Sequence, residues 1–413
     1  MSSFGDTLRD PVLLRWRLGR LHGAWPPPAD QGSSGFAVDL ARDGQRLYRA
    51  GLEDGDEEGA ANGLALLNEA ARAIRPSGIL DHGSTLCHLQ FSHAFADAWL
   101  AAERWHRPER RRLETVLTAL LAVLPALTLP GGLPEIGESP PGEGVARLSG
   151  LLPGGALDLG WTGTLPPAER QALGQRRDAA RLYDLERMRS DGWLRFDSGR
   201  WAGLWHGDPD GWPPADGYAH QDIGGFELHH GRHPVFVDPG SPPAGEPAVA
   251  AFYRSPLAHN GICLNGRAPY PQSRPFYNAA FRQAVAGPPP VLQAEYDGVS
   301  LSFDGYGRSG GRRQVQRRWQ FAGAGFRLDD LILGTGRARV ERRLITPLPV
   351  VVRDGLATLL LEDKPWAVGA DSPPVLHSLR RWNDNGDEVP LTMILFAVRA
   401  NLPWRGRITV TPL

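Results

Sequence analysis

The sequence predicts an α+β protein in two parts, an N-terminal set of packed helices and a C-terminal antiparallel β-sandwich. Before about residue 140, apolar residues repeat at three- and four-residue spacing, and after it short runs rich in Val, Phe, Leu and Ile dominate. The 50 Gly and 37 Pro are too many for an all-helical protein and indicate many turns between short strands. With 413 residues, 41% of them hydrophobic, the chain is long enough to form two cores.

Four segments of the first part have the pattern of amphipathic helices rich in Ala and Leu. They are residues 37–52, 59–74, 87–105 and 110–127. Because the breaks between them are short and polar, we expect antiparallel helical hairpins packed in a bundle or toroid. We place this helical domain at residues 1–140 and an irregular connection, marked by Gly and Pro, at residues 141–178.

The second part consists of short apolar runs closed by Gly, Asp and Pro, which is the pattern of antiparallel strands. The clearest runs are residues 192–199, 225–240, 298–307, 317–334, 342–352, 356–363 and 407–413. They predict a β-sandwich domain over residues 179–413.

Charge and cysteine content exclude several classes of protein. A formal net charge of -1 provides no basic field for nucleic acid, so no nucleic-acid partner is expected. Only Cys87 and Cys263 are present, so no disulfide framework holds the fold and one bridge at most can form. Charges interrupt every apolar run near the N-terminus, which predicts a cytoplasmic protein without a membrane span, or a periplasmic one if another route exports it. No pattern indicates the oligomeric state.

The stretch GYAHQDIGGFELHHGRHPVFVDPGS, Gly217–Ser241, carries polar groups that an ordinary strand does not need. On a strand, side chains alternate between faces, so Tyr218, His220 and Asp222 are expected to point the same way. The run HHGRH reads as a solvated turn between two strands.

Three residues near this stretch form a candidate metal site. His220, Asp238 at the end of the adjoining strand, and His259 before the next apolar run offer the N and O donors that zinc accepts. Their wide separation leaves no compact motif. Hydrogen-bonded histidines and an aspartate that caps a turn are the alternative interpretation.

The order and spacing of several short motifs resemble the C-terminal half of the heparinase II/III-like family. A His with an Asp two residues later is followed by FEL, then VDPG, YRS, AHN and NG, over roughly residues 217–267. The typical family run has the form GHxHADxLSFEL, then VDxG, then RSTxAHNTVxVDG. More weakly, RAGL and GILDHGSTLCH are similar to segments of the family's helical half.

The resemblance implies an incomplete N-terminal (α/α) toroid followed by the β-sandwich. It also implies a polysaccharide lyase that cleaves a uronic-acid-containing, acidic polysaccharide or oligosaccharide by β-elimination. His220, Asp238 and His259 match the family's zinc ligands. Asn260 and Arg254 match residues beside the metal, and we include both as candidate substrate-binding residues.

The expected catalytic pair is His88 and Tyr218. His88 matches the His of the family's Tyr–His pair, and Tyr218 takes the place of the first His of HxH. Cys87 stands where the family has its Tyr, and the Asn–His pair expected ahead of LYRAGL is absent. A hydrogen-bonded histidine between helices and a packing tyrosine are the alternatives for His88 and Tyr218.

Aromatic and basic side chains of the second part are further candidates for glycan contacts. Trp205 and its neighbouring tryptophans lie upstream of the metal hairpin, where they stack on sugars or pack under a loop. Four arginines flank a strand, namely Arg312, Arg313, Arg317 and Arg318. One interpretation is that they hold the carboxylates or sulfates of a glycan, and the other is that they end in solvent.

Two other functions stay open. One is a catalytically degenerate protein that binds glycan, or acts as a scaffold, in exopolysaccharide or capsule biosynthesis. The other is a metal-assisted glycan hydrolase.

Overall fold

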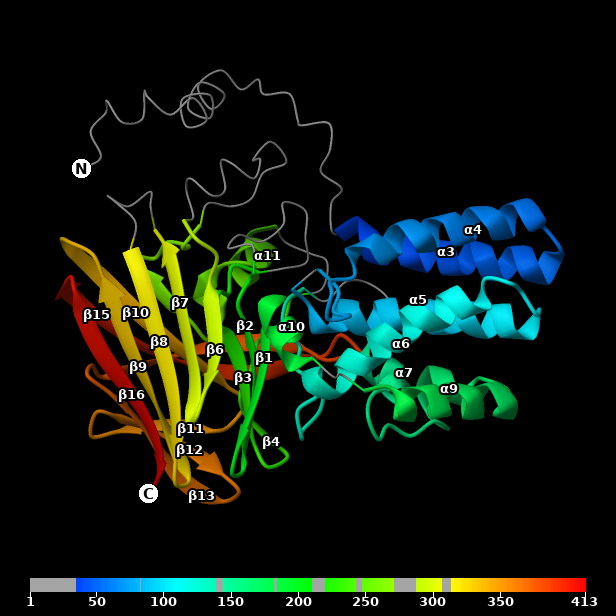
Figure 1. Cartoon of the computed structure of the whole chain (residues 1–413). Helices are drawn as coiled ribbons and strands as arrows, with labels where there is room; N and C mark the ends of the chain where they lie inside the picture. The colour runs from blue at the N-terminus through cyan, green and yellow to red at the C-terminus, as the bar shows by residue number, and fades with distance from the viewer. Residues whose placement is uncertain are drawn as a thin grey trace, which may run out of the picture.

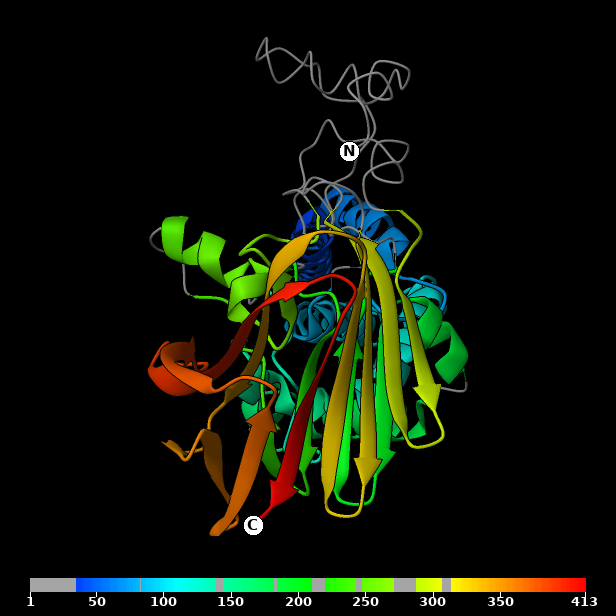
Figure 2. The ribbon, with the colours of Figure 1, turned by 90° about the vertical axis from the view of Figure 1, so that its left-hand side faces the viewer.

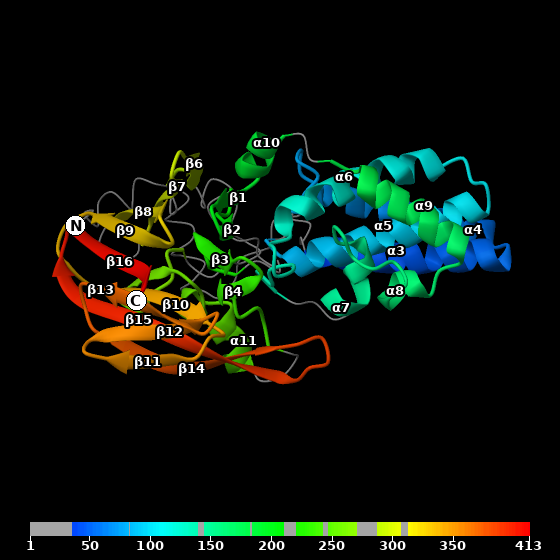
Figure 3. The same cartoon turned by 90° about the horizontal axis from the view of Figure 1, so that it is seen from below.

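The computed structural model describes residues 35–81, 83–138, 144–181, 184–209, 220–242, 247–270, 287–306 and 313–413. The longer helices gather on one side of the molecule and the strands on the other, as Figures 1 and 3 show from two directions. The structure therefore mixes α and β elements in the order that the sequence predicts, with helices first and antiparallel sheets after them.

The helical part is built from hairpins. Its longer helices are α3 (Gly35–Asp54), α4 (Glu57–Ala70), α5 (Thr85–Arg104), α6 (Arg110–Leu127) and α9 (Pro167–Ala179). Side chains cap two of the N-termini, since Asp56 accepts from the backbone N–H of Gly59 and Ser84 from that of Cys87. None of the helices in the described ranges is long and apolar enough to cross a membrane.

Glycines set the close approach of α3 and α4. A Cβ on Gly63 would lie 2.2 Å from the backbone nitrogen of Tyr48, on the facing helix. We predict that Gly63→Ala lowers the free energy of unfolding by about 1–3 kcal/mol, because the two backbones must move apart. Urea denaturation measures this. Asn62→Ala, an exposed change one position earlier on the same helix, is the control and is expected to leave stability almost unchanged.

The segment expected to be an irregular connection contains helices. Besides α9 it holds α7 (Val145–Leu148), η2 (Ser149–Leu151) and α8 (Gly160–Gly163), and α10 (Leu185–Ser190) follows. Leu148, Leu151 and Leu173 join the same buried cluster as the earlier helices. The helical core therefore extends past residue 140, because these short amphipathic pieces bury their leucines against it.

The described strands form three antiparallel sheets. The first has the order β1 (Trp193–Ser198), β2 (Trp201–His206), β3 (Gly225–His230) and β4 (His233–Phe236). The second has the order β14 (Pro374–Trp382), β15 (Glu388–Asn401), β10 (Arg337–Thr346) and β5 (Ile262–Leu264). The third has eight strands, in the order β11 (Val350–Arg353), β12 (Leu356–Leu361), β13 (Lys364–Ala370), β16 (Trp404–Pro412), β9 (Gly325–Leu333), β8 (Arg313–Ala322), β7 (Gly298–Gly305) and β6 (Val291–Glu295).

The sheet β1–β4 lies between the helices and the eight-stranded sheet. Ala202 and Leu204 belong to the helical core, whereas Trp201 and Trp205 belong to the core that the sheets share. Alternation along β2 thus buries both of its faces. In Figure 2, which looks along the direction from sheets to helices, the helices lie behind the strands. Side chains that leave β1–β4 on the helical side consequently lie at the junction of the two parts.

Candidate metal centre

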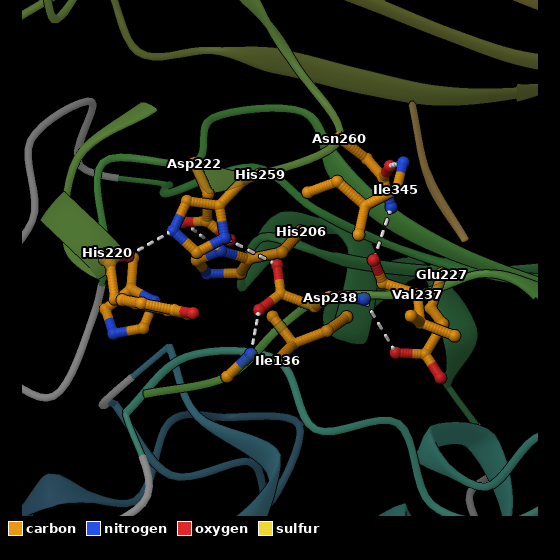
Figure 4. A network of polar contacts seen from close by, with 12 residues as sticks. Ile136, His206, His220, Asp222, Glu227, Val237, Asp238, His259, Asn260 and Ile345 are labelled. Carbon is orange, nitrogen blue, oxygen red and sulfur yellow. Dashed lines mark hydrogen bonds and ion pairs between the residues drawn. The ribbon is translucent and has the colours of Figure 1, made fainter. Parts of the chain in front are cut away.

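His220, Asp238 and His259 come together at this junction. One nitrogen or oxygen of each lies within 4.8 Å of those of the other two. His220 precedes β3, Asp238 follows β4, and His259 follows the short helix η3 (Pro256–Ala258), so three separate segments supply the group. All three are at most 1% exposed, and Figure 4 shows their side chains gathered near one another.

Both nitrogens of the His259 ring have a close partner. Nε2 lies 2.6 Å from the carbonyl oxygen of Tyr253, which only accepts, so Nε2 carries a hydrogen. Nδ1 lies 2.7 Å from Oδ2 of Asp238, where two lone pairs would face each other unless a proton or a cation lies between them. Burial lowers the pKa of His259, but the charge and hydrogen bond of Asp238 outweigh it and raise this pKa to about 9. The pair favours positive charge at this position.

His220 contributes a buried nitrogen that lacks a hydrogen bond. Its Nδ1 has no partner among the described residues, whereas Nε2 lies 3.3 Å from Oε2 of Glu138. A buried polar atom without a partner is unfavourable, and a metal ion would satisfy it. Two imidazoles and one carboxylate are donors that zinc accepts, with a fourth position left for water or substrate. The residues present therefore fit zinc.

The strand expected around His220 is not there. His220 and Asp222 lie in a loop that ends in a turn before β3, so strand alternation does not explain their common direction. Asp222 instead pairs with His206. Oδ1 of Asp222 lies 3.6 Å from Nδ1 of His206. Burial opposes charge on the pair, but the mutual attraction raises the pKa of His206 and lowers that of Asp222. This second buried pair beside the candidate ligands was not predicted, because His206 ends an apolar strand with no motif around it.

The supposed solvated turn is partly buried. His229 is 1% and His230 5% exposed, because both still belong to β3. His229 Nδ1 accepts from the backbone N–H of Gly131, in the segment after α6, at 3.0 Å. Its Nε2 lies 3.2 Å from Oε1 of Glu227, whose other oxygen accepts from the backbone N–H of Asp238. These contacts link the helical part to the strand before the metal ligand.

A second contact of this kind joins Glu138 and Arg254. The Glu138 carboxylate accepts two hydrogen bonds, each 2.7 Å long, from Nε and Nη2 of Arg254. Burial would raise the pKa of Glu138, but the hydrogen bonds from Arg254 and His220 lower it to about 2. Arg254 is 55% exposed and shares the Glu138 carboxylate with His220. Nothing in the local sequence indicates the role of Glu138.

The contacts of His88 are those of a buried histidine between helices. It is 1% exposed, its Nδ1 accepts from the backbone N–H of Leu80, and its Nε2 lies 3.0 Å from the carbonyl oxygen of Leu120. Burial lowers the pKa of His88 to about 4. Cys87 beside it is fully buried, and burial raises its pKa far above the ordinary range. The structure thus gives His88 satisfied nitrogens and no exposed surface, and its catalytic role stays a prediction.

Two predicted substrate-binding residues are also buried. Trp205 is 0% exposed and packs on Phe226 and Trp319, because alternation on β2 turns it into the core between the sheets. Its ring has no free face for a sugar in this structure. Asn260, also 0% exposed, uses its amide to join strands, donating to the carbonyl of Phe226 at 2.8 Å and accepting from the N–H of Ile345 at 2.7 Å. Tyr218 lies outside the described residues.

Comparison with known proteins supports the family resemblance. The model of the heparinase II/III-like, C-terminal family matches residues 180–372, which contain all three candidate ligands. The chain also superposes on a heparinase III gene product with methylated lysines at a TM-score of 0.63 and 16% identity. Residues 180–372 thus have the sequence of a heparinase II/III-like, C-terminal domain, and the chain has the fold of a heparinase III structure.

Further solved structures share its fold. Heparan sulfate lyase HepC from Pedobacter heparinus matches at a TM-score of 0.62 and 14% identity, over 97% of this chain and 62% of that one. The heparinase III gene product is likewise covered over 62% of its length by 97% of this chain. This chain therefore spans about 62% of the length of these structures, and at 14–16% identity the likeness concerns the fold. Among curated proteins, none matches the sequence.

Proposed function

We propose that this protein is a polysaccharide lyase that cleaves an acidic, uronate-containing polysaccharide by β-elimination. The observation that carries the proposal is the assembly of His220, Asp238 and His259 within a domain of this family. The structures that it resembles are named for heparinase III and heparan sulfate lyase activity. We also propose the finer architecture of an incomplete α/α toroid at residues 1–140, a connection at residues 141–178 whose helices pack on that toroid, and a β-sandwich at residues 179–413.

β-Elimination requires a group that neutralises the uronate carboxylate, a base for the C5 proton and an acid for the departing O4. Arg254, 55% exposed, holds Glu138 through Nε and Nη2, and its guanidinium has further N–H donors that suit a substrate carboxylate. We assign proton transfer to Tyr218, with His88 as its predicted partner. His220, Asp238 and His259 would hold zinc, which when bound supplies positive charge beside the substrate carboxylate.

A non-catalytic glycan-binding protein is the second candidate. The observation that favours it is that His88, Asn260 and Trp205 are buried, with the polar groups of His88 and Asn260 occupied by backbone partners. In that case the metal group would serve stability and the exposed guanidinium of Arg254 would bind an anionic sugar.

One experiment separates these functions. The purified protein is incubated with zinc and with heparan sulfate or other uronate polymers, and ultraviolet absorbance is followed. A lyase releases a product with a C4–C5 double bond that absorbs in the ultraviolet, and Arg254→Ala is expected to lower this rate by about tenfold or more. A matched control is Arg380→Ala, which removes an exposed guanidinium paired with Glu388.

The remaining outcomes decide against the lyase. New reducing ends without absorbance would indicate a hydrolase. Retention on an immobilised polymer without any product would indicate a binding protein.

A further inference from the structure

Among the described residues, Glu138 is the residue of the helical part whose side chain contacts a candidate ligand. It lies in the segment that follows α6, 82 positions before His220 in the sequence. Its Oε2 lies 3.3 Å from Nε2 of His220 and 2.7 Å from Nε of Arg254, while Oε1 lies 2.7 Å from Nη2 of Arg254. The Glu138 side chain is 12% exposed, so water competes little for these contacts.

The carboxylate determines which nitrogen of His220 can bind a metal. An ionised carboxylate only accepts, so the imidazole N–H must be on Nε2, and Nδ1 then presents its lone pair. Nδ1 is the buried atom without a hydrogen-bond partner in the described part of the chain. A hydrogen bond of this kind, from the far nitrogen of a metal-binding histidine to a carboxylate or carbonyl, fixes the tautomer and the ring orientation.

The other two ligands obtain the same support from the β part. His259 donates from Nε2 to the carbonyl of Tyr253, and Oδ1 of Asp238 accepts from the N–H of Gly240 at 2.9 Å. Each candidate ligand therefore has an outer partner on one atom, which leaves for a metal Nδ1 of His220 and the close pair of Nδ1 of His259 with Oδ2 of Asp238. For His220, this partner is a side chain that comes from the helical part.

We infer that Glu138 is a positioning residue for the metal, which fixes His220 with Nδ1 directed toward Asp238 and His259. This inference rests on the zinc site proposed above. Glu138 is not itself a ligand, since it is not in the group whose atoms lie within 4.8 Å of one another. Arg254 holds the carboxylate by two hydrogen bonds, so its geometry is fixed before a metal binds. Metal affinity thus depends on the docking of the helical part against the sheets.

The test is zinc affinity, measured by competition with a chromogenic chelator on the full chain. Glu138→Ala is expected to weaken zinc binding by about 10–100-fold, because His220 loses its orientation. Glu138→Gln retains an oxygen that accepts from Nε2 and is expected to recover part of this loss. In protein loaded with cobalt in place of zinc, Glu138→Ala should also shift the visible absorption bands, which a purely structural contact elsewhere would not change.

Glu169→Ala is the matched control. Glu169 is a similarly buried carboxylate, 18% exposed, and pairs with Arg104 at 2.7 Å inside the helical part. It is expected to leave zinc affinity and the cobalt spectrum unchanged. Wild-type affinity and an unchanged spectrum in Glu138→Ala would overturn the inference. A wild-type protein that takes up no zinc would instead overturn the metal site itself, before any variant is compared.

Discussion

Asp238→Ala is expected to abolish stoichiometric zinc binding and to lower the free energy of unfolding of the metal-free protein by about 3 kcal/mol. Asp238 supplies the only carboxylate of the three-ligand group. It is also the partner of Nδ1 of His259, at 2.7 Å, with both side chains at most 1% exposed. Its removal leaves a buried imidazole without its counter-charge. Metal analysis of the purified protein and urea denaturation in the presence of a chelator measure the two effects separately.

Asp197→Ala provides the control for this prediction. Asp197 also pairs with a cation, Arg195 at 2.7 Å, but its side chain is 56% exposed. An exposed pair contributes about 0–1 kcal/mol, so this variant should keep both zinc and stability. If Asp238→Ala retains zinc, or His220→Ala and His259→Ala do, the group is not a metal site. His220 and His259 would then be hydrogen-bonded histidines of the junction, the alternative that the sequence left open.

Local periodicity predicted helices α3 to α6 well but missed α9. The segment expected over residues 110–127 coincides with α6, although Pro125 lies in its last turn, because leucines repeat along one buried face. Strand β15 was not predicted. It lies between β14 and β10 and buries several consecutive side chains around Leu391–Phe396, so the alternation that marks a half-exposed strand is missing.

The residues of the candidate site likewise differ in how far the sequence predicts them. His220, Asp238 and His259 could be proposed as N and O donors from the sequence, but only the family resemblance favoured a metal site over hydrogen-bonded residues, because their spacing forms no compact motif. Glu138 and His206 carry no local signal at all, since their partners lie far away in the sequence and only the docking of helices on sheets brings them together. Trp205 could have been assigned to the core, because β2 is apolar on both faces and such strands are buried.

Arg317, on the eight-stranded sheet, is another residue whose burial the strand pattern indicates. It was expected to hold glycan or to end in solvent, but its side chain is 0% exposed. On β8, alternation places Val315, Arg317, Trp319 and Phe321 on one buried face, so the pattern itself indicates an interior arginine. Its Nε donates to Oδ1 of Asp330 on β9 at 2.8 Å, and Arg342 on β10 lies 4.0 Å from the other oxygen.

We expect Asp330→Ala to lower the free energy of unfolding by about 3–5 kcal/mol, which is a large part of the stability of an ordinary domain. The Asp330 side chain is 0% exposed. Its negative charge compensates the guanidiniums of Arg317 and Arg342, which belong to two different sheets. Its removal leaves Arg317 charged in the core without a counter-ion. Arg342 keeps Asp371 as a partner, so the loss is concentrated on Arg317. Urea denaturation monitored by tryptophan fluorescence measures the change in midpoint and slope.

Asp329→Ala is a control one residue away on the opposite face of β9. Asp329 is 30% exposed and pairs with Arg407 at 2.6 Å, so its loss should change stability by less than about 1 kcal/mol. The double variant Arg317→Met with Asp330→Ala removes both charges and is expected to recover much of the loss. If Asp330→Ala is no more harmful than Asp329→Ala, the buried pair does not hold the sheets. If the double variant adds further destabilisation, packing of the Arg317 side chain on Trp319, rather than its charge, is what stabilises the interior.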